Sequence, residues 1–113
     1  RNVGGVEGVG GDGELVAGAD GSDRITAWRA ASGEVAWTSD KLLYRELSAP
    51  LVVGRTVVFG DAQGNLHFLA REDGRQLLRL TTDGSAIVAP PTLAGKTLLA
   101  VTRSGGLFAF RPE

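Results

Sequence analysis

The sequence predicts an all-β protein whose small four-stranded antiparallel sheets are the blades of a β-propeller. Three observations carry this prediction. A 41-residue unit recurs along the chain, each unit divides into short apolar segments separated by turn residues, and helical periodicity is absent. One four-stranded sheet cannot bury two apolar faces by itself, whereas sheets packed around an axis can. A parallel β-helix would use shorter repeats, and a helical solenoid would need the missing helical pattern.

The repeat is clearest between residues 54–69 and 95–110, which align without a gap at an offset of 41 residues (95 minus 54). The same offset relates further positions: Ile25 to Leu66 and Leu107, Trp37 to Leu78, and Gly33 to Gly74. We therefore expect one partial propeller over residues 1–113, with repeat units at about 1–41, 42–82 and 83–113, the last lacking its outer strand.

The first unit begins with residues 1–10, which look like an inner strand of the first blade with extra glycine. In the middle unit, strands are predicted at about residues 49–53, 56–61, 65–71 and 75–81. The breaks between them contain Gly54, Gly64 and Gly74, and glycine supplies the positive φ that tight turns require. Residues 41–46 are either a helical turn or an extended connection between units.

Strand interiors such as residues 57–59 and 107–110 are apolar without strict alternation, which predicts that both faces of the sheets are covered. The 17 glycines, about twice average usage, are spread along the chain and indicate many tight turns. Dividing the length by the period leaves about 2.8 units, too few for a closed ring. We expect a fragment of a larger propeller, in which the third sheet has an unpaired strand edge and the first and last blades each have an uncovered face. These features favour oligomerisation or strand exchange.

Composition argues against several functions. Twelve basic and thirteen acidic residues leave a formal net charge of −1, with no basic cluster suited to nucleic acid or an anionic membrane. The absence of cysteine removes disulfides, thiolate nucleophiles and cysteine-based zinc sites. No apolar run reaches membrane-spanning length. Because the chain starts at Arg1 without an initiator Met, we expect a segment upstream of it.

Few residues suggest chemistry. His67 is the only histidine, and a metal site around it would need carboxylates, so we interpret it as a strand residue at a blade interface or edge. Asp20, Asp23 and Asp61 flank the predicted turns without calcium-loop spacing, and we interpret them as Asx turns. We expect no catalytic, cofactor-binding or metal-binding residue.

Two further motifs have alternative explanations. Residues 8–13 match Gly-x-Gly-x-x-Gly, but residues 14–19 continue as a strand rather than a helix, which indicates a turn instead of a dinucleotide site. Trp28 and Trp37 could stack on a quinone or a sugar, although packing between blades is the favoured role of Trp37. Tyr44 is the one obvious aromatic residue for a carbohydrate- or peptide-binding surface.

The tryptophan-containing segment 25–37 resembles the blade motif of quinoprotein-type propellers, and residues 48–53 are similar to its proline-led inner strand. Over about residues 12–110, the order of segments resembles the C-terminal portion of the BamB family. The segments that carry this resemblance are 23–27 (DRITA), 37–45 (WTSDKLLYR), 47–51 (LSAPL), 58–67 (VFGDAQGNLH), 72–75 (EDGR) and 104–110 (SGGLFAF).

This resemblance implies an eight-bladed propeller held by an N-terminal lipid on the periplasmic face of the bacterial outer membrane. It implies a non-catalytic scaffold of the β-barrel assembly machinery that binds the periplasmic domains of BamA and aids insertion of outer-membrane proteins. The lipid-bearing cysteine, the signal peptide and the earlier blades are not in this sequence. The family's BamA-contacting loops lie mainly on those earlier blades, so no partner-binding residue is assigned.

The alternative is a fragment of a quinoprotein dehydrogenase that holds pyrroloquinoline quinone in a similar propeller. Such enzymes supply a cysteine pair, calcium-binding carboxylates and basic residues around the cofactor, and that set is not recognisable in this sequence. We therefore expect no cofactor. Bound chromophore after addition of the quinone and calcium would distinguish the enzyme from the scaffold.

Overall fold

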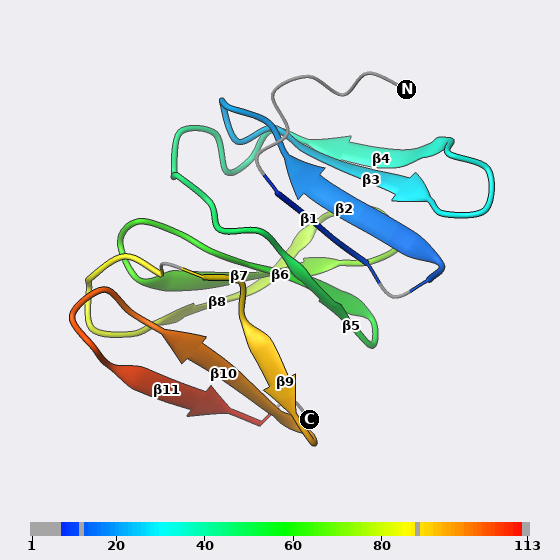
Figure 1. Cartoon of the computed structure of the whole chain (residues 1–113). Helices are drawn as coiled ribbons and strands as arrows, with labels where there is room; N and C mark the ends of the chain where they lie inside the picture. Colours follow the sequence, from blue (N-terminus) through cyan, green and yellow to red (C-terminus); the bar gives the residue numbers. More distant parts are fainter. Residues whose placement is uncertain (1–7, 12, 88, 112–113) are drawn as a thin grey trace.

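A computed structural model describes residues 8–11, 13–87 and 89–111, which form three antiparallel sheets and no helix (Figure 1). The first sheet contains β1 (Gly8–Gly11), β2 (Leu15–Ala19), β3 (Ile25–Arg29) and β4 (Val35–Ser39). The second contains β5 (Leu51–Val53), β6 (Thr56–Gly60), β7 (Asn65–Ala70) and β8 (Gln76–Thr81). The third contains β9 (Thr92–Ala94), β10 (Thr97–Val101) and β11 (Leu107–Phe110).

Each sheet is a meander in which strands adjacent in sequence pair with one another. The predicted strands of the middle unit all form, with ends shifted by no more than two residues from the expected positions. The inner strand that residues 1–10 predict is β1 in its described part, and it pairs with β2. The sequence therefore predicted the order and the type of these elements correctly.

One turn geometry recurs between the second and third strands of each sheet. Its left-handed residue is Asp23 in the first sheet, Gly64 in the second and Gly105 in the third, with φ of 68°, 83° and 94°. These positions are 41 residues apart. Glycine adopts such a backbone without strain, whereas the aspartate in the first copy does so at a cost.

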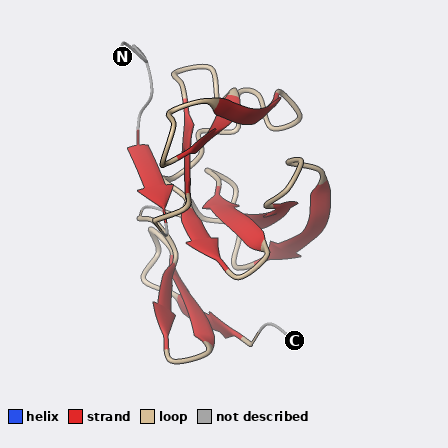
Figure 2. Ribbon diagram, turned by 90° about the vertical axis from the view of Figure 1, so that its right-hand side faces the viewer, coloured by secondary structure: helices blue, strands red, loops and turns tan. Residues whose placement is uncertain are grey.

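Two apolar clusters join the three sheets, which are arranged like a fan (Figure 2). Val57, Phe59 and Leu69 of the second sheet pack against the first sheet. The alternate residues Val58 and Phe68 pack toward the third sheet. Strands β6 and β7 are thus covered on both faces, as the apolar pattern predicted.

One face of β11 is uncovered, as expected for the last blade of a fragment. Leu107 is 66% exposed, because it points away from the cluster that Phe110 joins and no described element packs over it. Strand β8 is likewise mostly exposed. The continuous apolar run of residues 107–110 therefore identified a strand correctly, but only the position of the next sheet decides whether both faces of a strand are buried.

Trp37 joins the first sheet to the second. Its indole Nε1 donates a hydrogen bond to the backbone carbonyl of Arg71 at 2.7 Å. Its six-membered ring lies against Gly74, where a Cβ atom would overlap the ring. Gly74 has positive φ (79°) as well, so two constraints favour glycine there. The interpretation of Trp37 as packing between sheets is confirmed.

We predict that Trp37→Ala lowers the free energy of unfolding by about 3 to 5 kcal/mol, because a large buried side chain and its hydrogen bond are lost together. The matched control is Leu78→Ala, 41 residues later, where the side chain is 49% exposed and the loss should be about 1 kcal/mol or less. Urea unfolding followed by circular dichroism measures both. Equal losses of unfolding free energy would show that the contact of Trp37 with the second sheet does not contribute the predicted stability.

Candidate functional site

The loops of interest gather at one end of the sheets, on the left of Figure 1. They comprise the three recurring turns and the two links between sheets, which we call the first connection (residues 40–50) and the second connection (residues 82–91). The first connection contains turns at residues 41–44 and neither helix nor strand, so the extended alternative for residues 41–46 is wrong and a turn is found there instead. We refer to this part of the molecule as the connection end.

Asp20 and Asp61 cap equivalent turns. Each carboxylate accepts hydrogen bonds from the backbone N–H groups two and four positions later, at 2.8 to 3.0 Å. The backbone donors Arg24 and Ser22 hold the pKa of Asp20 below its ordinary value. The Asx-turn interpretation is confirmed for both aspartates. At the third equivalent position, the hydroxyl of Thr102 accepts one such bond at 3.1 Å.

Asp23 has a different role from the one expected. Its carboxylate accepts hydrogen bonds from the backbone N–H of Glu46 at 2.8 Å and of Leu47 at 3.0 Å, in the first connection. The Asx-turn interpretation is therefore wrong for this residue. The left-handed backbone of Asp23 places its buried side chain against the first connection rather than over its own turn.

Asp61 is the centre of a buried polar cluster. Its Oδ2 lies 2.7 Å from Nε2 of His67, 3.3 Å from Nδ2 of Asn65 and 3.7 Å from Nη1 of Arg45. Asp61 directly follows strand β6, and His67 lies in β7 opposite Phe59. Sequence reasoning treated Asp61 and His67 separately. Because the two residues lie on either side of one predicted turn, their contact could have been predicted from the sequence.

The hydrogen-bond network assigns the protonation of this pair. Nε2 of the Gln76 amide, a donor, lies 3.1 Å from Nδ1 of His67, so the ring proton is on Nε2 and is donated to Asp61. Burial lowers the pKa of His67, and the carboxylate of Asp61 only partly opposes this effect. Burial opposes ionisation of Asp61, but hydrogen bonds from His67, Asn65 and Gln63 outweigh it and lower the pKa.

The pair is therefore a neutral imidazole bound to a carboxylate. Both side chains are buried, and every contact given above is internal to the protein. General acid–base catalysis requires a side chain within hydrogen-bond reach of a substrate proton. The buried ring of His67 is not placed where a substrate could reach it. His67 is a strand residue between sheets, as the sequence predicted, and its role in the structure is to position Asp61.

The first connection presents Tyr44 to solvent. Its side chain is 78% exposed, and its backbone is left-handed (φ 62°), as is that of Glu46 (φ 55°). The N–H of Tyr44 donates to the carbonyl of Ser22 at 3.1 Å, and the carbonyl of Arg45 accepts from Ala62 at 3.0 Å. The connection is thus held by the turns of both neighbouring sheets.

The second connection is held by a different set of side chains. The carboxylate of Asp83 accepts hydrogen bonds from Ser85, Thr102 and Ser104, at 2.7 to 2.8 Å from their hydroxyl groups. These bonds, those from Ser85 first, hold the pKa of Asp83 well below its ordinary value. The carbonyl of Asp61 also accepts from the N–H of Ile87 at 2.9 Å.

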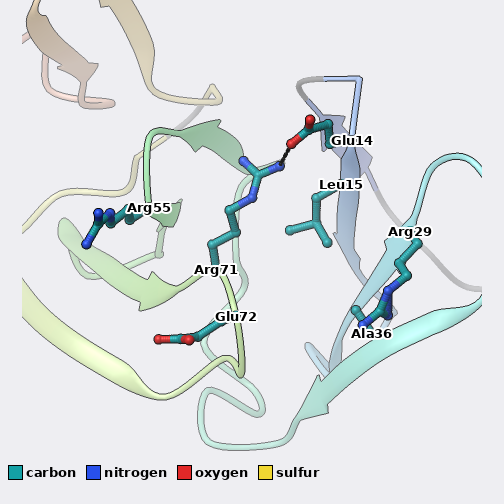
Figure 3. A pocket seen from close by; sticks show the side chains of 7 residues that line it. All are labelled: Glu14, Leu15, Arg29, Ala36, Arg55, Arg71 and Glu72. Atoms are coloured by element: carbon teal, nitrogen blue, oxygen red, sulfur yellow. Dashed lines mark hydrogen bonds and ion pairs between the residues drawn. The ribbon is translucent and has the colours of Figure 1, made fainter.

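A groove of about 490 Å³ lies between the first two sheets, lined by Glu14, Leu15, Arg29, Ala36, Arg55, Arg71 and Glu72. Arg71 pairs with Glu14 across it at 3.4 Å, while the side chains of Arg55 and Glu72 point away from Glu14 and Leu15 (Figure 3). Because the guanidinium groups do not converge, this groove does not form a cradle for a phosphate or a carboxylate.

The remaining sequence motifs have structural roles. Trp28 and Trp37 are 7% and 8% exposed, so neither indole offers an open face for stacking on a quinone or a sugar. The glycine motif at residues 8–13 supplies β1 and is followed by β2, and so it does not open a helix. In the described ranges, no three His, Asp or Glu side chains gather to hold a metal ion. No helix in that same part of the chain is suited to cross a membrane.

A sequence profile described as "Outer membrane protein assembly factor BamB" matches residues 1–113. A protein of that name from Burkholderia pseudomallei is 46% identical over 106 residues, which cover 94% of this chain and 28% of the relative. The chain thus spans less than a third of this curated relative's length.

Solved structures agree with these sequence matches. BamB from Moraxella catarrhalis superposes with a TM-score of 0.81 at 25% identity, over 91% of this chain and 30% of that one. A quinohemoprotein alcohol dehydrogenase from Pseudomonas putida gives 0.75 at 12% identity, over 98% of this chain and 20% of that one, and shows a shared fold alone. The predicted fold class, a portion of a propeller with antiparallel blades, is confirmed.

We predict that acid destabilises the protein in two steps. The folded-state pKa of His67 is below 6.5, so its contribution to stability is present above pH 6.5 and is lost as the pH falls through the folded value. The folded-state pKa of Asp61 is below 3.8, so a second loss begins below pH 3.8. Urea unfolding between pH 8 and pH 3 measures both steps.

His67→Gln is the control for this measurement, because the chain has no other histidine. The variant should lose the first step and keep the second. An unchanged slope between pH 7 and pH 5 in His67→Gln would contradict the assignment.

We also predict that Asp61→Ala costs about 3 kcal/mol or more of unfolding free energy, because the buried partners of the carboxylate lose their acceptor. Asp20→Ala, at the equivalent turn, removes a more exposed cap and should cost clearly less. Denaturation midpoints compare the two variants. Similar losses would mean that turn capping alone, and not the buried cluster, is the contribution of Asp61.

Proposed function

The chain belongs to the family of the outer membrane protein assembly factor BamB, and from that premise we propose that it acts in outer-membrane protein assembly as a non-catalytic scaffold that binds protein. The match over residues 1–113 carries this proposal. The geometry supports it, because the groups best suited to catalysis, His67 and Asp61, are committed to a buried internal cluster.

We propose that its partners are the periplasmic domains of BamA, and that it works on the periplasmic face of the outer membrane. Contact with the membrane itself would come through an N-terminal lipid anchor, as the family resemblance implies. The name of the relative supports a place in outer-membrane protein assembly, and the partner is the one that the family resemblance implies. The hydrogen-bonded loops of the connection end offer a surface of fixed shape. A fixed surface binds with little loss of conformational entropy.

We further propose that the units 1–41, 42–82 and 83–113 are successive blades, with the outer strand of the third supplied from outside that unit. In the described part of the chain, β11 is the outer edge of its sheet and Leu107 is exposed. An open edge with exposed apolar residues favours pairing with another strand. In isolation, the 113-residue chain should therefore oligomerise or exchange strands.

Light scattering tests this proposal on the isolated chain. The expected mass exceeds the 11.7 kDa of one chain. A mass of one chain, together with a single cooperative thermal transition, would contradict it.

A quinoprotein dehydrogenase remains the alternative function. Its support is a shared fold at 12% identity, which is shared with the scaffold as well. Addition of pyrroloquinoline quinone with calcium separates the two proposals. The scaffold should give no bound chromophore after gel filtration, whereas an enzyme should retain one.

The binding prediction is tested with the protein at its full natural length and purified periplasmic domains of BamA. We expect saturable binding with Kd of about micromolar strength or tighter, measured by isothermal titration calorimetry. An unrelated periplasmic protein of similar charge is the control ligand. Absence of binding to the BamA domains at a concentration of about 100 µM, where even weak complexes form, would overturn the proposed partner.

A further inference from the structure

Backbone strain in the described residues is concentrated where the first sheet meets the first connection. Among these residues, positive φ at a position other than glycine occurs only at Asp23 (68°), Tyr44 (62°) and Glu46 (55°). Gly64 and Gly105, the equivalents of Asp23, adopt this backbone without strain. A strained backbone persists only where surrounding contacts impose it.

The contacts that impose this strain come from the turn between β2 and β3. The buried carboxylate of Asp23 accepts hydrogen bonds from the backbone N–H of Glu46 at 2.8 Å and of Leu47 at 3.0 Å. The carbonyl of Ser22 accepts one from the N–H of Tyr44 at 3.1 Å. Hydrogen bonds to a carboxylate are stronger than those between neutral groups. Their gain is of the same order as the cost of the left-handed residues, so this form of the first connection depends on Asp23.

A separate set of contacts holds the first connection to the second sheet. The carbonyl of Arg45 accepts a hydrogen bond from the N–H of Ala62 at 3.0 Å, and its Nη1 lies 3.7 Å from Oδ2 of Asp61. The N–H of Ser48 donates to the carbonyl of Gly60 at 2.8 Å, and the Ser48 hydroxyl accepts from the N–H of Gly60 at 3.0 Å. These contacts do not involve Asp23, so they can persist when the bonds to its carboxylate break.

The second connection is held differently at the matching position. Ile87, which lies 41 residues after Glu46, is buried in the apolar cluster between the second and third sheets and is not left-handed. Its N–H donates to the carbonyl of Asp61 at 2.9 Å, and it forms a β-bridge with Thr102. In the first connection, by contrast, Tyr44 and Glu46 are exposed. Segments with little buried apolar surface open locally while the rest of a protein stays folded.

We propose that residues 44–47 form a strap that is hinged on the second sheet through Arg45 and latched to the first sheet by the carboxylate of Asp23. When the latch opens, Tyr44 and Glu46 return to ordinary backbone conformations, and the exposed ring of Tyr44 moves while the three sheets stay folded. The latched form predominates, because a buried carboxylate without its donors is costly. The open form is a minor state, populated to about 1%.

Amide hydrogen exchange, resolved by residue and measured on the protein at its full natural length, tests this proposal. The N–H groups of Glu46 and Leu47, which we call the latched amides, report the opening. In the wild type, their protection against exchange should be about tenfold or more below that of the Ile87 amide. Their exchange should not respond to low concentrations of urea, because a local opening exposes little surface.

Two variants of the latch should change this exchange in opposite directions. Asp23→Gly keeps the turn, which has glycine at this position in the other two sheets, and removes both bonds. The latched amides should then exchange about tenfold faster or more. Tyr44→Asn suits the left-handed backbone and relieves strain in the latched form, so the latched amides should exchange about threefold slower or more. The Ile87 amide is the internal control and should change by less than about twofold in both variants.

Equal protection of the latched amides and of Ile87 in the wild type would show that the first connection opens only with the whole fold, and would overturn the strap. Exchange of the latched amides in Asp23→Gly within about twofold of wild type would overturn the role of Asp23 as the latch. Exchange in Tyr44→Asn that is no slower than in the wild type would overturn the role of strain. If Asp23→Gly does not fold, Tyr44→Asn decides, because it keeps every bond of the latch. No partner enters these measurements, so their outcome is independent of the proposed function.

Discussion

The buried carboxylate of Asp61 is the interaction on which the arrangement of the second sheet depends. One oxygen caps the turn between β6 and β7, and the other binds His67 and faces Arg45 of the first connection. Its backbone carbonyl accepts from Ile87 of the second connection. A buried carboxylate must have every bond satisfied to remain charged. Asp61 therefore holds the β6–β7 hairpin and both connections together.

In each sheet a side chain links the recurring turn to a neighbouring connection, but the residue that does so differs from sheet to sheet. The first uses Asp23, whose carboxylate holds the backbone of the first connection. Where the second connection meets the third sheet, Asp83 is bound by hydroxyl groups that include that of Thr102. The geometry repeats every 41 residues although the side chains do not. Hydrogen bonds to backbone groups at fixed places require an acceptor there, and several residue types can supply one.

Function follows from how the polar and apolar groups are distributed. At the connection end, the side chains of Asp23, Asp61, His67 and Asp83 are engaged in hydrogen bonds within the protein. Apolar contacts such as that of Trp37 with Gly74 hold the sheets at fixed relative positions. Tyr44 of the first connection is largely exposed although its backbone is left-handed, a conformation that residues other than glycine rarely adopt.

The sequence by itself determined the strands, the recurring turns and the packing role of Trp37, because period, apolar runs and glycine positions act locally. It also placed Asp61 at a turn and His67 in a strand. Only the tertiary structure decided that these two residues pair and that Asp23 reaches the first connection. These features depend on which segments meet after the hairpins close and the sheets stack, and no local pattern encodes the direction of a side chain toward a distant partner.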